Sequence, residues 1–439
     1  MTRQTIATSA LTVLLMALFF ASISIIHAQA SADNWSMFRH DLAHTGESTS
    51  VPTVAASVQL WNYSTGNAIA SSPAIVDGYL YIGGLDGTAY CLDALDGSKV
   101  WNYTVKGRIG GFQGQGSGAI GSSIAVANGH VYFGSYDRNV YCLDASTGEK
   151  VWNFTTQGTV ESCPSVSGGR VYVGSWDGNM YCFNAISGEK IWNYTTNGLI
   201  ESSPAVADDY VYFGSSNFKV YCLDANTGAE KWTFTTGNII MSSPAVVNDF
   251  VYIGSEDNNV YCLSKWNGSE IWSFTTEGWV DSSPAIAKNR LYVGSWIPAG
   301  QNAEPSKVYC LDAITGTKIW EYKTEDGVNS SPAIADDFVY VGGWDNNVYC
   351  LNASSGAVVW VYPTQAHVNS CPAIANGIVY VGSWDHNIYA FGVIDGAGFF
   401  PLSTELVCAL VLIAVVVLIV ITVTILKRST RPMRAANVD

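Results

Sequence analysis

Short apolar runs alternate with short polar turns along most of the chain. The stretch 202–235, SSPAVADDYVYFGSSNFKVYCLDANTGAEKWTFT, contains four such runs, rich in β-branched and aromatic residues. Asp, Asn, Gly and Ser separate the runs, and this pattern predicts four antiparallel strands joined by tight turns. The middle runs are apolar at nearly every position, which is typical of strands that are covered on both faces.

A tryptophan marks the fourth run of each copy of this unit. Five of the seven intervals between these tryptophans are 40 residues long, and the other two are 51 and 48. A period near 40 with four strands in each period predicts the blades of a β-propeller. The tryptophans are Trp61, Trp101, Trp152, Trp192, Trp232, Trp272, Trp320 and Trp360.

A second motif, Ser-Ser-Pro-Ala or a near copy, opens the unit eight times, the last time at Ser370. The eighth unit has only three runs, whereas the segment 58–64, VQLWNYS, is a fourth run without a blade of its own. We therefore expect this segment to complete the last blade and close the ring, which leaves no open sheet edge between the two ends. The predicted fold is an all-β, eight-bladed propeller over residues 58–392, with Trp61 and Tyr389 in one sheet.

The N-terminal end predicts export from the cytoplasm. In residues 1–30, Arg3 precedes an apolar core that ends at Ala28-Gln29-Ala30, which is the pattern of a cleaved secretory signal peptide. Residues 31–57 then form a lead-in to the propeller.

The C-terminal end predicts a membrane anchor. After a linker at 393–405, residues 406–426 carry no charge and are long enough to span a bilayer as one helix. Basic residues follow in the short tail 427–439, which places the tail in the cytoplasm and the propeller outside the cell. We thus expect a single-pass protein of the cell membrane. The alternative is a sorting tail that is cleaved within 401–405.

Charge and cysteine usage exclude several classes of function. The net charge of −15 argues against nucleic-acid binding, which needs a basic face. Seven cysteines recur at one Tyr-Cys position of successive blades, too far apart for disulfides, and we interpret them as small buried residues. Cys163 and Cys371 replace the second serine of the Ser-Ser-Pro-Ala motif in blades three and eight. These blades are not neighbours, so no bridge is expected, and no C-x-x-C spacing indicates a thiolate metal site.

Four Asn-x-Ser/Thr sequons directly follow a repeat tryptophan. Because neighbouring residues of a strand point to opposite faces, these asparagines are predicted to face outward and are candidates for glycosylation. The alternative is that the sequon was copied with the repeat and carries no glycan. The four residues are Asn62, Asn102, Asn153 and Asn193.

The stretch LDASTGEKVW, residues 143–152, is one copy of a Leu-Asp-Ala-x-Thr-Gly-x-x-x-Trp pattern. This pattern resembles the repeat of the PQQ-like (quinoprotein-like) β-propeller superfamily, and WSMFRHD at 35–41 resembles the lead-in of such proteins. The resemblance implies that the eight repeat tryptophans are structural residues that dock each blade on the next. It covers roughly residues 35–392.

That superfamily includes quinoprotein dehydrogenases and non-enzymatic outer-membrane assembly lipoproteins. The resemblance to the dehydrogenases would imply PQQ, calcium ligands, a catalytic Asp and a disulfide between adjacent cysteines, but the chain has no Cys-Cys pair and no catalytic residue can be assigned. The lipoproteins have a lipidated N-terminal cysteine, whereas the first cysteine here is Cys91. We interpret the chain as a non-enzymatic, membrane-anchored member without a bound cofactor or metal.

One rim of the ring is predicted to bind a ligand. Two insertions, at 107–120 and 297–306, fall on the rim of the second-to-third strand turns and blade connections, and extra loops on one face of a repeat array often mark a binding face. Aromatic and acidic residues at variable repeat positions of this rim suit a carbohydrate or a peptide. The candidates are Tyr136, Trp176, Trp296, Trp344, Trp384, Glu161, Glu201 and Asp281.

Plainer interpretations of these residues stay open. The aromatics could pack between blade tops, and the carboxylates could be solvated rim residues. A calcium site built from Glu161, Glu201 and Asp281 has nothing in the sequence that fixes its geometry. Trp-Asp pairs, as at 176–177, resemble those of WD40 repeats, but they fall at a turn, where the Asp is explained by turn formation.

The leading hypothesis is a cell-surface, membrane-anchored scaffold that binds a protein partner or an envelope glycan through the rim with the two insertions. The alternative is a PQQ- and calcium-dependent dehydrogenase of alcohols or sugars. A third possibility is a structural component of the cell envelope. The sequence shows no triad-like arrangement of its six histidines and no phosphate-binding loop.

Overall fold

The computed structural model describes residues 34–48, 58–105, 119–297 and 306–392. The predicted signal peptide, linker, membrane span, tail and most of both insertions lie outside these ranges. Within the described ranges, no helix is long and apolar enough to cross a membrane.

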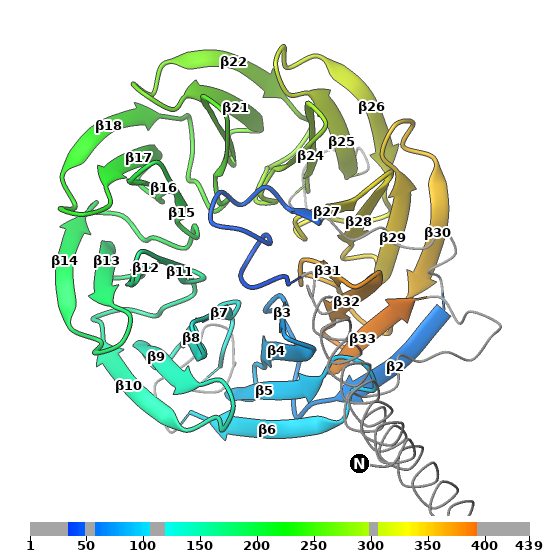
Figure 1. Ribbon diagram of the computed structural model, residues 1–439. Coiled ribbons are helices and arrows are strands. Elements are labelled where there is room, and N and C mark those ends of the chain that lie inside the picture. Colours follow the sequence, from blue (N-terminus) through cyan, green and yellow to red (C-terminus); the bar gives the residue numbers. More distant parts are fainter. Residues whose placement is uncertain (1–33, 49–57, 106–118, 298–305, 393–439) are drawn as a thin grey trace, which may run out of the picture. The chain divides into compact units, whose positions relative to one another are not determined.

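Eight antiparallel sheets are arranged around one central axis, and together they form the predicted eight-bladed propeller (Figure 1). We call the region along this axis the channel. Each sheet runs from a three-residue strand at the channel to a longer strand at the outer edge. The first four blades are β3 (Ala74–Val76), β4 (Tyr79–Gly83), β5 (Thr88–Asp93) and β6 (Lys99–Thr104); β7 (Ala125–Ala127), β8 (His130–Gly134), β9 (Asn139–Asp144) and β10 (Lys150–Thr155); β11 (Ser165–Ser167), β12 (Arg170–Gly174), β13 (Asn179–Asn184) and β14 (Lys190–Thr195); and β15 (Ala205–Ala207), β16 (Tyr210–Gly214), β17 (Lys219–Asp224) and β18 (Glu230–Thr235).

The other four blades repeat this arrangement. They are β19 (Ala245–Val247), β20 (Phe250–Gly254), β21 (Asn259–Ser264) and β22 (Glu270–Thr275); β23 (Ala285–Ala287), β24 (Arg290–Gly294), β25 (Lys307–Asp312) and β26 (Lys318–Lys323); β27 (Ala333–Ala335), β28 (Phe338–Gly342), β29 (Asn347–Asn352) and β30 (Val358–Pro363); and β31 (Ala373–Ala375), β32 (Ile378–Gly382), β33 (Asn387–Gly392) and β2 (Val58–Ser64).

The eighth blade is completed by the N-terminal strand, as predicted. Strand β2 pairs antiparallel with β33, with Trp61 opposite Ala390 and Asn62 opposite Tyr389. Figure 1 shows the two strands, from opposite ends of the propeller, side by side. The ring is therefore closed by backbone hydrogen bonds, and neither terminal blade has an open strand edge where the ends meet.

Neighbouring blades are joined through the repeat tryptophan and the turn that follows the third strand. Trp101 of the first blade donates from Nε1 to the carbonyl of Ala145 in the second blade at 2.9 Å. The Asp144 carboxylate caps that turn by accepting the backbone N–H of Ser146. Gly148 has φ 72°, and a Cβ there would lie 2.6 Å from the Trp101 ring, which explains why the position is glycine.

This arrangement recurs around the ring. Seven of the eight repeat tryptophans donate from Nε1 to a backbone carbonyl of the next blade. For the eighth, Trp360, the residue equivalent to the acceptor is 393, which lies outside the described residues.

The Ser-Ser-Pro-Ala motif forms a closed circle of hydrogen bonds around the channel. The backbone N–H of the second motif residue donates to the side-chain oxygen or sulfur of the equivalent residue in the next blade, at 2.8–3.2 Å. We call this circle the serine ring. It runs through Ser72, Ser123, Cys163, Ser203, Ser243, Ser283, Ser331 and Cys371, and returns to Ser72.

The cysteines follow from this geometry. Cys163 and Cys371 act as hydrogen-bond acceptors in the serine ring, through their sulfur atoms. All nine cysteines within the described ranges are buried and free, in agreement with the prediction that the repeated cysteines form no disulfides.

The lead-in, Asn34–Ser48, lies inside the channel, where Figure 1 shows it in dark blue at the centre of the ring. Its carbonyls accept backbone N–H groups from the innermost strands of six blades: Ile75, Val126, Val206, Val246, Ile286 and Ile334. Strand β1 (Glu47–Ser48) adds to the seventh blade by pairing parallel with β27. The inner edge of an innermost strand would otherwise leave backbone N–H groups unpaired. The lead-in carbonyls accept these N–H groups and so cover the open strand edge of each of the six blades.

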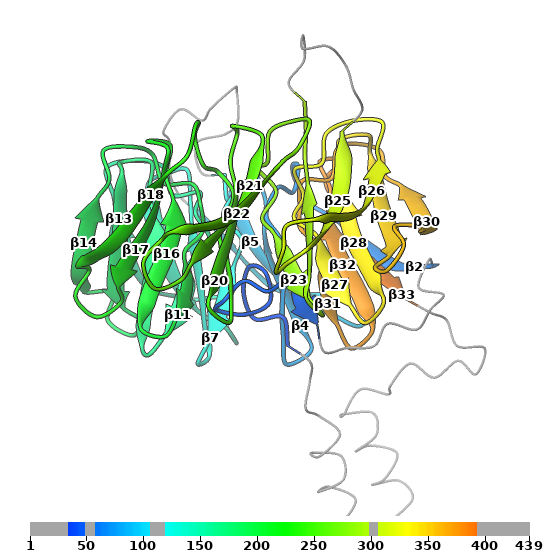
Figure 2. The same cartoon turned by 90° about the horizontal axis from the view of Figure 1, so that it is seen from above.

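Side chains of the lead-in also bond to the innermost part of the blades. The Arg39 guanidinium is 1% exposed and donates to the carbonyls of Pro284, at 2.6 Å, and Pro332. His44 is equally buried and contacts the Pro244 carbonyl through Nδ1 at 3.2 Å. We call this end of the channel, on the side of the first-to-second strand turns, the lower mouth; in Figure 2 the lead-in lies toward that side.

Candidate binding site at the upper channel mouth

The opposite end of the channel, the upper mouth, is formed by two positions of each repeat. One is the residue directly before the Ser-Ser-Pro-Ala motif, on the blade connection, and the other is the residue that opens the second-to-third strand turn. The backbone joins the two positions, as where Trp176 N–H donates to the Thr159 carbonyl at 2.8 Å. Every residue predicted for the binding rim occupies one of these two positions, and all of them are partly buried: Tyr136, Trp176, Trp296, Trp344, Trp384, Glu161, Glu201 and Asp281.

Blades six to eight give the upper mouth a continuous aromatic arc. The ring centroids of Trp279 and Trp296 are 5.1 Å apart, and those of Trp296 and Trp344 are 5.3 Å apart. His367 continues the arc, at 5.6 Å from Trp344 and 6.0 Å from Trp384. The interpretation that these aromatics pack on one another is therefore partly correct, but each ring keeps some exposed surface.

Several buried polar atoms of this arc lack a hydrogen-bond partner among the described residues. They include the indole Nε1 atoms of Trp344 and Trp384 and the Oδ1 atoms of Asn329 and Asn369. Such atoms are rare in folded proteins because each loses its hydrogen bond to water without replacement. Their concentration at one mouth indicates a surface suited to a ligand that supplies the missing partners.

Blades three to six give the upper mouth four carboxylates: Glu161, Glu201, Glu256 and Asp281. Tyr136 donates to Glu161 at 2.8 Å, and Trp296 donates from Nε1 to Asp281 at 2.5 Å. None of the four forms an ion pair with a lysine or arginine of the described chain. Within the described ranges, the negative charge of this half of the mouth therefore has no paired cation.

Burial and mutual repulsion raise the pKa values of these acids. Burial raises the pKa of Glu201 well above its usual range, and the charges of Glu161, Asp281 and Glu256 raise it further. Burial, followed by the charge of Asp281, raises the pKa of Glu256 to about 7. Burial raises the pKa of Asp281 to about 6, although the hydrogen bond from Trp296 opposes the shift. The interpretation of these residues as freely solvated rim acids is therefore wrong.

The calcium site considered for Glu161, Glu201 and Asp281 is not formed. In the part of the chain that the structure describes, no three His, Cys, Asp or Glu side chains come together as a group able to hold a metal ion. The three acids stand in blades three, four and six, and the equivalent position of the intervening fifth blade is Met241. The shared repeat position brings them to one mouth but not to one point.

Five residues that the structure places in this site were not predicted from the sequence: Glu256, Trp279, Asn329, His367 and Asn369. Three of them occupy the same two repeat positions as the predicted residues, and that equivalence was the signal that could have identified them. Trp279 and His367 are different, because each stands two residues before the residue that flanks the motif. Only the packed structure shows that their rings join the aromatic arc.

Other motifs of the sequence have structural explanations. The Asp177 carboxylate of the Trp-Asp pair accepts the N–H of Asn179 at 2.9 Å and the hydroxyl of Tyr181 at 2.8 Å, which fixes a turn, as predicted. The four sequon asparagines lie exposed on the outermost strands β2, β6, β10 and β14: Asn62, Asn102, Asn153 and Asn193.

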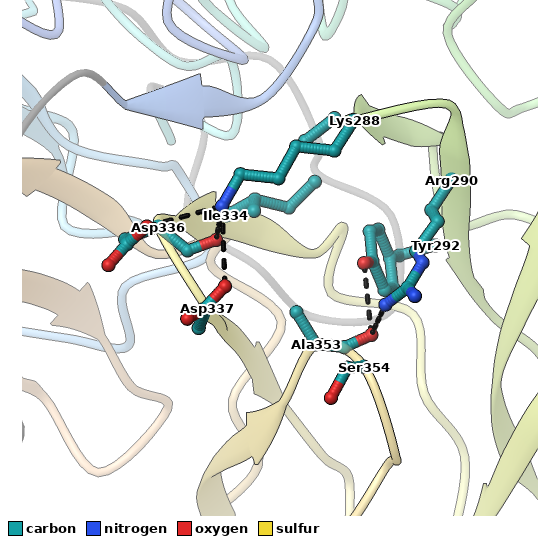
Figure 3. A pocket seen from close by; sticks show the side chains of 9 residues that line it. Lys288, Arg290, Tyr292, Ile334, Asp336, Asp337, Ala353 and Ser354 are labelled. Carbon is teal, nitrogen blue, oxygen red and sulfur yellow. Dashed lines mark hydrogen bonds and ion pairs between the residues drawn. The ribbon is translucent and has the colours of Figure 1, made fainter.

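A cavity of about 200 Å³ lies between blades six and seven on the side of the lower mouth (Figure 3). Lys288 at its edge reaches Asp336 at 3.2 Å and Asp337 at 3.3 Å. Arg290 and the Tyr292 hydroxyl both donate to the Ala353 carbonyl at 3.1 Å. Because these polar groups already have partners within the chain, the cavity is a weaker candidate for ligand binding than the upper mouth.

Three family profiles match parts of the chain. They describe the β-propeller of the beta-alanine-activating enzyme, over residues 115–295, the outer membrane protein assembly factor BamB, over 304–398, and the β-propeller domain of glucose/ethanol/alcohol dehydrogenase, over 51–162. All three are propeller repeats, and together they match most of the described ring.

Individual relatives come from two groups. BamB of Salmonella typhimurium is 32% identical over 104 residues, which are 23% of this chain and 26% of that protein. The quinohemoprotein alcohol dehydrogenase of Comamonas testosteroni is 28% identical over 134 residues, 29% of this chain and 19% of that protein. The matched segments thus span about a quarter or less of these relatives. The solved structure of BamB from Moraxella catarrhalis is similar with a TM-score of 0.63 at 19% identity, over 76% of this chain and 97% of that one, which is a likeness of fold.

Proposed function

Since the chain is built of PQQ-like β-propeller repeats, we propose that it is a binding scaffold whose upper mouth holds a partner protein or an envelope glycan. The observation that carries this proposal is the difference between the two mouths. The chain's own lead-in fills the lower mouth, where Arg39 Nε and His40 Nδ1 lack a hydrogen-bond partner among the described residues. The upper mouth combines aromatic faces with a larger set of such atoms. Each such atom costs about 1–3 kcal/mol, which a ligand's hydrogen bonds would recover.

The aromatic arc favours a sugar or an extended peptide as the bound group. Indole faces provide large apolar contacts with little loss of side-chain freedom, and the amides of Asn329 and Asn369 can form hydrogen bonds with hydroxyl or peptide groups. The resemblance to outer membrane protein assembly factors supports a scaffold, and that to alcohol dehydrogenases supports an enzyme. Fold alone does not decide between them, so the proposal depends on the chemistry of the site.

The residues of the upper mouth do not fit PQQ with calcium. PQQ is itself a carboxylate-bearing anion, and the four acids of the mouth would repel it. No three acidic or metal-binding side chains of the described ranges form a calcium site, and the described cysteines are all free, so no disulfide covers the mouth. These features favour the scaffold over the dehydrogenase.

We further propose that the scaffold is exported and held at the cell surface by residues 406–426. The uncharged span and the basic tail after it support this placement. Exposure of the sequon asparagines on the outermost strands is compatible with glycans at the circumference, away from both mouths.

Binding by the full-length chain tests the proposed function. The double variant Trp344→Ala, Trp384→Ala removes two indole faces of the arc, and we expect its capture of cell-envelope proteins or glycans to fall at least tenfold. Trp266→Ala is the matched control, because Trp266 is 59% exposed on an outer turn. Unchanged binding by the double variant would show that the upper mouth is not the binding site. Dye-coupled turnover of alcohols or sugars with added PQQ and Ca²⁺ would overturn the scaffold proposal in favour of the enzyme.

A further inference from the structure

The charge of the upper mouth limits what it can bind. Four carboxylates from consecutive blades lie at the upper mouth: Glu161, Glu201, Glu256 and Asp281. Burial and the neighbouring acids raise the pKa of Glu201, and no basic residue contributes to that shift. Buried carboxylates without a paired cation are uncommon in folded proteins, because burial removes the water that stabilises their charge.

Glu256 is the acid of this group whose carboxylate has no partner among the residues that the structure describes. Its side chain is only 6% exposed, yet its carboxylate forms no hydrogen bond or ion pair with any residue of the described ranges. The bonds of Glu256 go through its backbone, to Ile239 and Asn238. The Glu256 carboxylate oxygens are not among the fully enclosed atoms, so a cationic ligand at the upper mouth can reach them.

The neighbouring aromatics add a second attraction for the same kind of ligand. Trp296 joins the two halves of the mouth, because its Nε1 donates to Asp281 while its ring packs between Trp279 and Trp344. The faces of indole rings attract cations through the ring quadrupole, most strongly where water is excluded. Acids on one side and indole faces on the other together favour a group that is positively charged and partly apolar.

We propose that the group bound in the upper mouth is an organic cation, an ammonium or guanidinium, attracted by the carboxylates of Glu201, Glu256 and Asp281 and by the indole faces of Trp296 and Trp344. This inference rests on the proposed function, since it names the chemistry that the scaffold recognises. A bare metal ion fits less well, because no three ligand side chains converge among the described residues. An anion would meet repulsion from all four acids.

Two sources can present this cation: the basic side chain of a polypeptide, or a free amine. Titration calorimetry with the full-length chain at pH 8 separates them. The probes are N-acetyl-arginine amide and N-acetyl-lysine amide for the polypeptide source, spermidine for the free amine, and N-acetyl-norleucine amide as the neutral control. We expect at least one cationic probe to bind at least tenfold more tightly than the neutral amide. Preference for the amino-acid amides identifies a polypeptide, and preference for spermidine identifies a free amine.

Variants then assign the binding to named residues. Glu256→Gln and Glu201→Gln keep the shape of the side chain and remove its charge, and each is expected to weaken the cationic probe about tenfold or more. Glu189→Gln, an exposed acid of the β13–β14 turn, is the matched control and is expected to bind as the unchanged chain does. A thermal melt of each variant verifies that the ring is folded.

The pH dependence gives a second readout. The groups that face Glu256 and Glu201 are Glu161 and Asp281, with the Tyr136 hydroxyl on Glu161 and the Trp296 Nε1 on Asp281. Lowering the pH from 8 to 5.5 protonates these acids, and we expect the affinity for the cation to fall at least tenfold. The affinity of Glu256→Gln is expected to change less over the same range.

The outcomes separate this inference from the proposed function. Equal binding of cationic and neutral amides, or no effect of either glutamine variant, overturns the cation. If partner capture then still depends on Trp344 and Trp384, the proposed binding face stands without it. If cationic probes bind and need Glu256, but partner capture ignores Trp344 and Trp384, the cation site stands and the proposed scaffold function fails.

Discussion

The two mouths of the channel are built from the same eight repeats, but they differ in how many of their polar groups have partners among the described residues. At the lower mouth, the lead-in accepts backbone N–H groups from six blades, and its Arg39 donates to two proline carbonyls. At the upper mouth, the part of the chain that the structure describes gives four acids no basic partner, and gives the indole N–H groups of Trp344 and Trp384 no acceptor. The comparison teaches that one end of a repeat ring can serve stability while the other is left available for recognition.

The largest effect on stability is expected from a substitution at the lower mouth, which tests whether the lead-in stabilises the ring. Arg39→Ala removes the donors to Pro284 and Pro332 and leaves a cavity under Gly46, so we expect a loss of about 3 kcal/mol in the free energy of unfolding. Relief from burying a charge offsets part of the loss, since burial lowers the pKa of Arg39 to about 10. Urea unfolding of the full-length chain measures it, and an unchanged midpoint would contradict the stabilising role of the lead-in.

The serine ring lies between the two mouths and tests whether they are independent. Ser203→Ala removes the acceptor of the Cys163 N–H, at 2.9 Å, and leaves that buried donor unpaired. We expect a loss of about 1–3 kcal/mol in unfolding free energy, and little change in ligand binding at the upper mouth. Cys163→Ser is the matched control, because it restores the repeat's own residue and keeps an acceptor for Ser123 N–H. An equal loss in both variants would show that the ring contributes through packing alone.

The upper mouth is expected to lower stability as its acids ionise. Burial raises the folded-state pKa of Glu256 from 4.5 to about 7 and that of Asp281 from 3.8 to about 6, so the folded chain holds protons that the unfolded chain has released. Stability should therefore fall as pH rises from about 4 to 7 and level off above that range. Glu256→Gln should remove part of this dependence and raise stability at pH 8 by about 1 kcal/mol, a value reduced for screening by water.

Thermal melts of Glu256→Gln between pH 4 and 8 measure this effect. Glu189→Gln serves as the control, since that acid is exposed. A parallel pH profile in both variants would mean that the acids of the upper mouth are not electrostatically strained.

The smallest effect is expected at the surface of the lower side. Lys288 pairs with Asp336 and Asp337, but all three side chains are substantially exposed. Lys288→Ala should change the unfolding free energy by less than about 0.5 kcal/mol, because exposed ion pairs contribute little. If Lys288→Ala lowered the unfolding free energy as much as Arg39→Ala, surface ion pairs and not the lead-in would be the main source of stability at the lower mouth.

Much of the fold could be predicted from the sequence because the same pattern of strands and turns recurs in eight units. The recurring tryptophan gave the blades, and the unmatched run at 58–64 predicted that β2 completes the last sheet, which its pairing with β33 confirms. Equivalence of repeat positions likewise predicted that Glu161, Glu201 and Asp281 share one mouth.

The rest depends on contacts that no local pattern encodes. The lead-in has no repeat period, so nothing in WSMFRHD places Trp35 or Arg39 inside the channel. The repeat pattern also predicts in which blade and at which rim a residue lies, but not which side chains it contacts. The lack of a partner for the Glu256 carboxylate among the described residues could therefore be recognised only in the structure. The same holds for the contact of His367 with the aromatic arc.

The pairing of β2 with β33 has a consequence for biosynthesis. The lead-in, Asn34–Ser48, and strand β2 are synthesised before the blades, yet the strand that pairs with β2 ends at Gly392, and the carbonyl that receives the Ser48 hydroxyl belongs to Ile374. Nascent chains interrupted before this point can neither seal the ring nor seat the segment that threads its axis. Completion of the last blade is thus the event that encloses the lead-in, and a protease that cuts within 34–48 would distinguish finished molecules from truncated ones.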